Sequence, residues 1–253
     1  MRLIYIGSGE FGLPTLTYLH EYHEIVAVVS QPDKPAGRRR QMSPTPVADW
    51  AQASGLRVLK SGDVNADEFI EQVAGMNADA SVVIAFGQKL SDKLIKSLGK
   101  LAVNLHASLL PKYRGAAPIN WAMINNEKVT GVSVIALAQR MDAGDVYAAA
   151  EIQIDPLETA GQLHDRLAEL GPEVVGKVLG DLELDCLHAI GQDESQATRA
   201  PKLSKSDGTV DFNQPVELVR ARIHGLTPWP GCRVIWHSQS TGTSTELILK
   251  RVS

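Results

Sequence analysis

Residues 104 to 122 place polar and titratable side chains directly after an apolar run. The segment reads NLHASLLPKYRGAAPINWA, and a single residue separates its first amide, Asn104, from the imidazole of His106. Side chains alternate along a strand, so Asn104 and His106 would project from one face while Val103 and Leu105 point into the opposite layer. An amide N–H and a titratable ring nitrogen together suit an oxygen that gains negative charge during acyl transfer.

A carboxylate follows the next strand-like run. The run VSVIALAQ ends in RMDAGD, so Asp142 stands at its carboxyl end on a glycine-containing loop. If the ends of these neighbouring strands share one sheet edge, Asp142 can contact His106, hold its tautomer and increase its basicity.

Each of these three residues also has a structural explanation. A strand-end Asn is often a turn former, a single His is often a partly buried packing residue, and an Asp before Ala-Gly often shapes a loop. Their joint placement at neighbouring strand ends favours catalysis. No Ser or Cys stands in a nucleophile elbow, which favours direct transfer between two bound substrates over a covalent enzyme intermediate.

The composition is that of a globular chain with a sizeable core. The 253 residues are 44% hydrophobic and 21% charged, with a formal net charge of -4, which excludes fibrous and disordered classes and disfavours general coating of nucleic acid. The first apolar stretch is too short for a signal peptide, so we expect a cytoplasmic protein. Cys186 and Cys232 show no disulfide or zinc spacing, and we expect two buried free thiols and no metal.

Short β-branched runs alternate with helical patterns, which predicts a Rossmann-like, doubly wound α/β domain with a mainly parallel sheet over residues 1–189. The predicted strands are 2–7, 24–30, 56–60, 80–86, 100–106 and 132–138. The predicted helices are 13–23, 67–76, 117–126 and one long helix over 160–182.

The pattern changes after this long helix. Residues 190–208 are polar and rich in turn formers, which predicts a linker. Residues 209–253 hold one short helix and two strand-like runs, and two strands cannot close a barrel. We therefore expect that 209–253 begins a small C-terminal β-barrel domain that is incomplete.

A glycine motif follows the first predicted strand. Residues 7–12, GSGEFG, match the dinucleotide fingerprint G-x-G-x-x-G. The second strand, however, ends at Ser30 and not at an acidic residue that could bind a ribose, and Asp33 lies in a proline-bracketed loop. We favour a tight turn that serves packing, and keep a non-catalytic nucleotide-binding module as the alternative from another class.

A basic loop follows the second predicted strand. The segment QPDKPAGRRRQMSPTPV groups Lys34, Arg38, Arg39 and Arg40 between prolines. Guanidinium groups match phosphate oxygens, so the loop could hold a nucleic-acid backbone. A solvated charged loop is the equally open structural interpretation.

These motifs together resemble the folate-dependent formyltransferases. The resemblance rests on the pair Asn104 and His106, on SLLPKYRGAAPINWA and on MDAGD. It extends over almost the whole chain through GSGEFGLPTL, QPDKPAGR with SPTPV, VVIAFGQKL, APKLSKSDGTVDF and PWPG. The segment QPDKPAGR is most similar to the branch of the family that acts on methionyl-tRNA, whereas SLLPKYRG and PWPG also occur in its sugar-nucleotide relatives.

The resemblance implies a reaction and roles for the three residues. A formyl group would pass from 10-formyltetrahydrofolate to the α-amine of methionine on initiator tRNA. Asn104 and protonated His106 would stabilise the oxyanion, while Asp142 would polarise His106 and remove the amine proton, directly or through a water. An amino-sugar nucleotide or another small amine is the alternative acceptor.

The resemblance also implies binding residues. A folate pocket would be formed, mostly through backbone groups, by Phe86, Gly87, Gln88, Ser108, Leu109, Leu110, Pro111, Gln139, Arg140 and Met141. The acceptor arm of tRNA would contact Lys34, Arg38, Arg39 and Arg40. The sequence departs from the family in two places. Gly37 is followed by three arginines, where the family commonly continues Gly-Arg-Gly-Lys. The C-terminal β-barrel of the family would need about 50 further residues. We expect a monomer.

Overall fold

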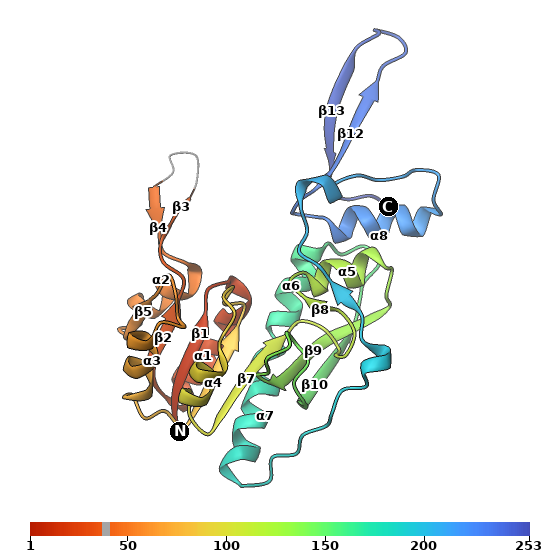
Figure 1. Cartoon of the computed structure of the whole chain (residues 1–253). Coiled ribbons are helices and arrows are strands. Elements are labelled where there is room, and N and C mark those ends of the chain that lie inside the picture. The colour runs from red at the N-terminus through yellow and green to blue at the C-terminus, as the bar shows by residue number, and fades with distance from the viewer. Residues whose placement is uncertain (37–40) are drawn as a thin grey trace. The chain divides into compact units, whose positions relative to one another are not determined.

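The computed structural model describes residues 1–36 and 41–253, and its elements are labelled in Figure 1. The strands are β1 (Arg2–Gly7), β2 (Glu24–Ser30), β3 (Lys34–Ala36), β4 (Gln41–Ser43), β5 (Val58–Lys60), β6 (Ala80–Ile84), β7 (Leu101–His106), β8 (Arg114–Gly115), β9 (Val129–Ala136), β10 (Val146–Gln153), β11 (Arg199–Ala200), β12 (Cys232–His237) and β13 (Ser244–Leu249). The α-helices are α1 (Leu13–Tyr22), α2 (Pro46–Ala53), α3 (Asp67–Ala74), α4 (Asp92–Ser97), α5 (Pro118–Ile124), α6 (Ala160–Ala168), α7 (Gly171–Glu183) and α8 (Val216–Gly225). Short 3-10 helices are η1 (Glu10–Gly12), η2 (Glu194–Gln196) and η3 (Lys205–Asp207).

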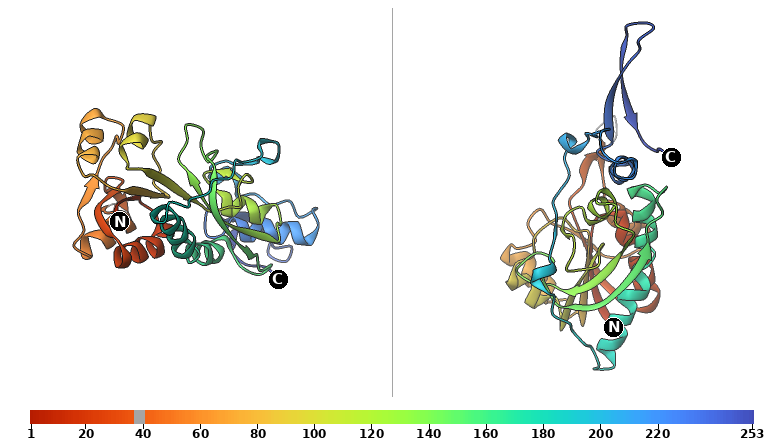
Figure 2. Two further views of the ribbon diagram at one scale, coloured as in Figure 1. Left: turned by 90° about the horizontal axis from the view of Figure 1, so that it is seen from below. Right: turned by 90° about the vertical axis from the view of Figure 1, so that its right-hand side faces the viewer.

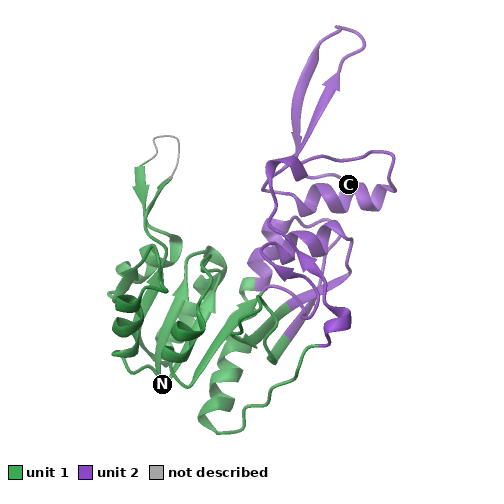
Figure 3. Ribbon diagram, viewed as in Figure 1, with its two compact units in different colours: residues 1–106, 132–149, 168–192 green, residues 107–131, 150–167, 193–253 purple. Residues whose placement is uncertain are grey.

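The chain forms two compact units, which are coloured separately in Figure 3. Unit 1 contains residues 1–106, 132–149 and 168–192. Unit 2 contains residues 107–131, 150–167 and 193–253. The boundary between the units falls within β9 and β10, so these two strands belong partly to each.

The main sheet has the strand order β10-β9-β7-β6-β1-β2-β5. The pairs β1–β2, β1–β6, β2–β5 and β6–β7 are parallel, and only β9 is shown to run antiparallel to its neighbour β7 among the pairs described. Consecutive parallel strands need crossover helices, which cover both sheet faces and leave the strands buried. The predicted doubly wound, mainly parallel sheet is therefore confirmed.

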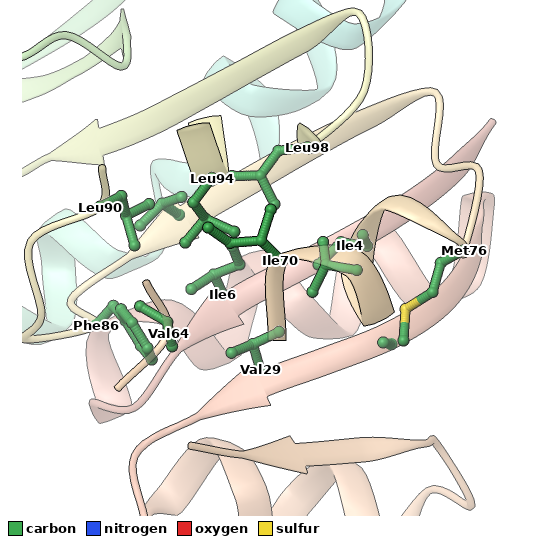
Figure 4. Close-up of a cluster of buried hydrophobic side chains, with 13 residues drawn as sticks. Ile4, Ile6, Val29, Val64, Ile70, Met76, Phe86, Leu90, Leu94 and Leu98 are labelled. Carbon is green, nitrogen blue, oxygen red and sulfur yellow. The ribbon is translucent and has the colours of Figure 1, made fainter. Parts of the chain in front are cut away.

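Helices cover both faces of the sheet in unit 1. Helices α1 and α7 pack against each other on one face, and α3 and α4 lie on the other (Figure 2). Side chains from α3 and α4 join those of the central strands in one apolar cluster (Figure 4). Its labelled members are Ile4, Ile6, Val29, Val64, Ile70, Met76, Phe86, Leu90, Leu94 and Leu98. Each such side chain stabilises the fold by about 1.5–3 kcal/mol when it is fully removed from water.

The glycine motif after β1 is used for packing. A Cβ atom at Gly12 would lie 1.9 Å from the Tyr5 hydroxyl, and one at Gly7 would lie 2.7 Å from the carbonyl oxygen of Ile84. The fully buried Tyr5 donates its hydroxyl to the backbone oxygen of Gly12 at 3.0 Å. No larger residue fits at either glycine, which supports the packing interpretation of GSGEFG.

The single long helix predicted over 160–182 is wrong, because two helices occupy this region. Helix α6 ends at Ala168, and α7 starts at Gly171 with Pro172 in its first turn. Proline lacks a backbone N–H and disfavours helical geometry in the residue before it, so it ends one helix and suits the first turn of the next.

The segment 193–208, which the sequence predicts to be part of a linker, makes specific contacts within unit 2. Strand β11 pairs in parallel with β8, and the backbone N–H of Tyr113 donates to Thr198 Oγ1 at 2.8 Å. The guanidinium of the buried Arg114 binds both carboxylate oxygens of Glu194, at 3.2 and 2.9 Å. These contacts fix the segment onto the β8 region, while the domain boundaries at 189 and 208 stay a prediction.

The two strand-like runs near the C-terminus form an antiparallel hairpin. Strands β12 and β13 pair from Cys232 with Leu249 to His237 with Ser244. Before the hairpin, Asn120 of α5 donates to the backbone oxygen of Gly225 in α8 at 2.7 Å. The helix and both strands are confirmed, and the start of a β-barrel domain stays a prediction.

The two cysteines differ in their surroundings. Both are free thiols, and Cys232 is buried whereas Cys186 is exposed. The expectation of two buried thiols is therefore wrong for Cys186, which follows the end of α7 in the chain. Burial raises the pKa of the Cys232 thiol.

Candidate active site

Strand β7 positions the first two residues of the candidate site. Val103 and Leu105 are buried with exposed fractions of 0% and 3%, and they alternate with Asn104 and His106 as the strand period requires. Asn104 is half-buried and His106 is buried. This burial pattern is consistent with the predicted strand and with Asn104 and His106 on one face of it.

The structure brings Asp142 to His106. The Nδ1 atom of His106 lies 3.7 Å from Oδ2 of Asp142, and the two side chains are 7% and 13% exposed. This separation is an ion-pair distance slightly beyond hydrogen-bond length. Catalytic hydrogen bonds are often long in the absence of substrate and shorten in the substrate complex.

The predicted reason for this closeness is wrong. Strand β9 runs antiparallel to β7, with Val103 opposite Ala136 and His106 opposite Ser133. The carboxyl end of β9 therefore lies beside the middle of β7, and the two strands do not end at one edge. It is the loop 137–145 that returns the chain to His106.

Backbone contacts hold the loop 137–145 against the sheet. The N–H of Leu137 donates to the oxygen of Ala102 at 3.1 Å, and the N–H of Ala136 donates to the oxygen of Asp145 at 2.9 Å. Asp142 adopts the left-handed region, with φ of 55°, which Asp tolerates better than most residues. The loop is thus a defined structure that presents one carboxylate.

Asn104 lies two residues before His106 on β7, and all three candidate residues belong to unit 1. Among the described residues, the structure gives the amide of Asn104 no hydrogen-bond partner, so the amide can donate to a ligand oxygen. Charges in a partly buried pair interact several times more strongly than in water. Asn104, His106 and Asp142 can therefore stabilise a developing negative charge and accept a proton.

The predicted folate loop after β6 has an unusual backbone. Ala85 and Gly87 have φ of 48° and 87°. The ring of Phe86 belongs to the hydrophobic core, and its backbone oxygen accepts from Gln31 Nε2 at 3.3 Å. The Gln88 amide is engaged on both sides, since it accepts from the N–H of Val64 and donates to the oxygen of Ser61. The side chains of Phe86 and Gln88 are thus engaged within the protein, and the backbone groups of this loop are the candidates for ligand contact.

The other predicted folate residues in unit 1 precede Asp142. Gln139 donates a hydrogen bond to the Asp92 carboxylate in the first turn of α4. Met141 is 66% exposed, and the backbone oxygen of Arg140 accepts from the N–H of Ala143. Gln139 therefore supports the loop from outside.

The remaining predicted folate residues, 108 to 111, belong to unit 2. The hydroxyl of the buried Ser108 donates to the backbone oxygen of Lys112 at 2.7 Å. Leu109, Leu110 and Pro111 are half-buried. Ser108 thus closes its own turn.

The predicted tRNA-binding residues begin at a small hairpin in unit 1. Lys34 is exposed and pairs with Ser43 across β3 and β4. Next to it, the carboxylate of Asp33 forms an ion pair with Lys60 at 2.5 Å. Arg38, Arg39 and Arg40 lie outside the described residues.

Two absences concern the described part of the chain. Within it, no three His, Cys, Asp or Glu side chains gather as a set of metal ligands. None of the helices formed by these residues has the length and apolarity that crossing a bilayer requires.

Comparison with known families decides the identity. Residues 1–179 match the family described as formyl transferase. The chain belongs to the formyl transferase family. Residues 202–249 of this family member match the formyl transferase C-terminal domain. The resemblance drawn from the sequence motifs is confirmed.

Individual relatives cover most of this formyl transferase. The methionyl-tRNA formyltransferase of Geobacter metallireducens is 41% identical over 232 residues, which are 91% of this chain and 75% of that protein. The corresponding enzyme of Acetivibrio thermocellus is 42% identical over 231 residues, 91% of this chain and 74% of its own. The solved N-formyltransferase of Helicobacter canadensis, in complex with folinic acid and dTDP-3-aminofucose, has a TM-score of 0.71 at 13% identity and covers 99% of both chains, which shows the shared fold.

Sequence reasoning missed one residue that contacts the loop carrying Asp142. Gln192 donates from Nε2 to the backbone oxygens of Asp142 and Gly144. It lies in a polar stretch that the sequence marks only as linker, and no motif or periodicity distinguishes it.

Proposed function

We propose that this chain transfers a formyl group from 10-formyltetrahydrofolate to the α-amino group of methionyl-initiator tRNA, at the start of translation. The acceptor is supported by the relatives named methionyl-tRNA formyltransferase, which are about 40% identical over nine tenths of the chain. The observation that carries the chemistry is the buried contact between His106 and Asp142.

The three residues divide the reaction between them. The amine of the acceptor forms a bond to the formyl carbon, and the formyl oxygen gains negative charge. The Asn104 amide and a protonated His106 donate to that oxygen, and Asp142 accepts the proton of the attacking nitrogen, directly or through a water. The carbonyl then re-forms as the bond from the formyl carbon to the folate nitrogen breaks, and that nitrogen takes up the proton that Asp142 received.

The folate-type cosubstrate fits the two loops that flank the catalytic residues. The turn at Ala85 and Gly87 carries positive φ angles, and such turns expose backbone N–H and C=O groups to a ligand. A pterin ring presents donors and acceptors along its edges, which backbone groups of the turn and of the loop 139–141 can match. Ser108, Leu109, Leu110 and Pro111 of unit 2 remain predicted folate-binding residues.

The tRNA is proposed to bind through the basic residues of the β3–β4 segment. Lys34 is exposed on β3, and the three arginines that follow in sequence add further positive charge. Phosphate contacts of this kind give affinity that does not depend on base sequence.

A comparison of two acceptors tests the proposed function. The purified chain is mixed with 10-formyltetrahydrofolate and either methionyl-initiator tRNA or an amino-sugar nucleotide, and the formylated product is quantified. We expect formyl-methionine after hydrolysis of the tRNA ester and no formylated sugar. Formylation of the sugar alone would assign the other acceptor class, and binding of NAD without any transfer would favour the non-catalytic nucleotide-binding module.

A further inference from the structure

The side-chain amide of Gln192 spans the turn that carries Asp142. Its Nε2 atom lies 2.9 Å from the backbone oxygen of Asp142 and 2.7 Å from that of Gly144. An amide nitrogen has two hydrogens, so both are used on this one turn. All three residues belong to unit 1.

A backbone bridge fixes the register of Gln192 against the loop. The N–H of Val146 donates to the oxygen of Ile190 at 2.8 Å, and the N–H of Ile190 donates back at 2.9 Å. Two residues later, the side chain of Gln192 reaches the turn. The bridge attaches the segment through backbone atoms, independently of the side chain of Gln192.

The turn holds Asp142 in a backbone conformation that non-glycine residues adopt less readily. Asp142 has φ of 55°, in the left-handed region that residues other than glycine adopt only where local contacts favour it. The two hydrogen bonds from Gln192 to the backbone oxygens of Asp142 and Gly144 stabilise this conformation. The backbone angle at Asp142 sets where its carboxylate points.

We propose that Gln192 is a positioning residue, which holds the backbone at Asp142 so that the carboxylate faces His106. This inference rests on the proposed function, because the orientation of the Asp142 carboxylate matters only if that carboxylate takes part in formyl transfer. Gln192 itself touches no reacting atom. A displacement of about 1 Å at a catalytic group can reduce a rate about 100-fold, so removal of the two bonds affects the chemical step more than substrate binding.

Two substitutions remove the donors with little change in size. Gln192→Glu places a carboxylate oxygen against two carbonyl oxygens, and Gln192→Met leaves an apolar group there. Gln196→Glu and Gln196→Met are the matched controls, because Gln196 belongs to unit 2 and its amide donates to the exposed carboxylate of Asp193. Gln192 is half-buried, so we expect all four variants to fold.

Steady-state kinetics and a double-mutant cycle test the role. We expect both Gln192 variants to lower kcat about 10- to 100-fold with KM for both substrates and the unfolding midpoint unchanged, and both Gln196 variants to match the wild type. In an Asp142→Asn background, a further change at Gln192 should lower the residual rate no more, because its effect passes through Asp142. A wild-type kcat in the Gln192 variants, or effects that multiply in the double variant, would overturn the proposal.

Hydrogen exchange tests the same contact without any activity. We expect amides of residues 137–145 to exchange faster in Gln192→Met than in wild type, while those of β7 keep their rates. Unchanged exchange of 137–145 would overturn the positioning role. An inactive wild type would instead overturn the proposed function, and the exchange result would still decide the contact.

Discussion

The Nδ1 atom of His106 lies 3.7 Å from Oδ2 of Asp142, although the strand before Asp142 runs antiparallel to the strand that carries His106. The contact is therefore made by the loop 137–145 and by the interactions that hold it. The proposed catalytic geometry therefore depends on a loop packed against the end of β9. Substitutions that disturb the loop should act on turnover before they act on the fold.

Gly144 offers a test of the loop packing. A Cβ atom at this position would lie 1.9 Å from the backbone oxygen of Ala136, so Gly144→Ala must shift the loop and with it Asp142. We expect turnover to fall about 10- to 100-fold, as measured by initial rates of formyl transfer.

Gly180 provides the control for this substitution. It lies in α7, where a Cβ atom would have no neighbouring atom within 4 Å, so Gly180→Ala should stabilise the helix by about 1 kcal/mol and leave the rate unchanged. Normal turnover in Gly144→Ala would show that the loop tolerates displacement and that its packing does not set the carboxylate.

The buried side chain of Thr15 carries an unsatisfied hydroxyl group. The Oγ1 atom of Thr15 is buried in α1 and has no hydrogen-bond partner among the described residues. A buried unsatisfied polar group costs about 1–3 kcal/mol, so Thr15→Val, which keeps the shape, should increase the free energy of unfolding by about 1 kcal/mol. Chemical denaturation measures this change.

Thr45 gives the opposite expectation for the same substitution. Its hydroxyl accepts from the N–H of Ala48 at 3.1 Å as the N-cap of α2 and bonds to Ser30 Oγ at 2.6 Å. Thr45→Val should therefore decrease the free energy of unfolding by about 1–2 kcal/mol. If both substitutions destabilised equally, the buried hydroxyl of Thr15 would have a partner after all.

His224 predicts a pH dependence of stability. It is 1% exposed, and burial lowers the pKa of its imidazole. Its Nε2 accepts from the N–H of Val252 at 3.1 Å and its Nδ1 lies 3.2 Å from the oxygen of Pro156, which fits a neutral ring. As the pH falls through about 6.5, the unfolded chain binds a proton that the folded chain does not, so stability decreases.

The measurement is the free energy of unfolding between pH 8 and pH 5. We expect His224→Gln to have lower stability than wild type at pH 8 and a smaller decrease toward pH 5, while the exposed His188→Gln keeps the wild-type slope. Equal slopes in wild type and His224→Gln would contradict the assignment of a neutral buried ring.

The basic segment predicts the salt dependence of tRNA binding. Replacing Arg38, Arg39 and Arg40 with alanine should weaken binding of methionyl-tRNA, and it should reduce the slope of log affinity against log salt by about 0.7–0.9 for each phosphate that is no longer neutralised. The matched lysine triple variant keeps the charge and should retain most of the slope. Unchanged affinity and turnover in the alanine variant would contradict the proposed role of the segment.

Local sequence patterns predicted many of the helices and strands, because interactions between residues near in sequence determine these elements. The strand 101–106 and the shared face of Asn104 and His106 follow from alternation and from an apolar run before polar residues. The break between α6 and α7 was also present in the sequence as Gly171 and Pro172, but continuous helical periodicity on both sides concealed it.

Strand direction and contacts between residues far apart in the sequence could not be predicted from local patterns. The direction of β9 depends on how the loop before it crosses the sheet, which no local pattern encodes, so the expected meeting of strand ends was wrong although Asp142 does reach His106. The contact of Gln192 with the loop joins residues 50 positions apart through an ordinary polar side chain. Such a residue carries no signature in sequence until the chain is folded.

The single-turnover rate of formyl transfer to methionyl-tRNA tests the central claim most directly. It is measured for wild type and for Asn104→Ala, His106→Ala and Asp142→Asn, with each variant shown to be folded by its unfolding midpoint. We expect each substitution to lower the rate about 100- to 1,000-fold. Wild-type rates in the folded His106→Ala and Asp142→Asn proteins would contradict the assignment of this pair as the catalytic centre.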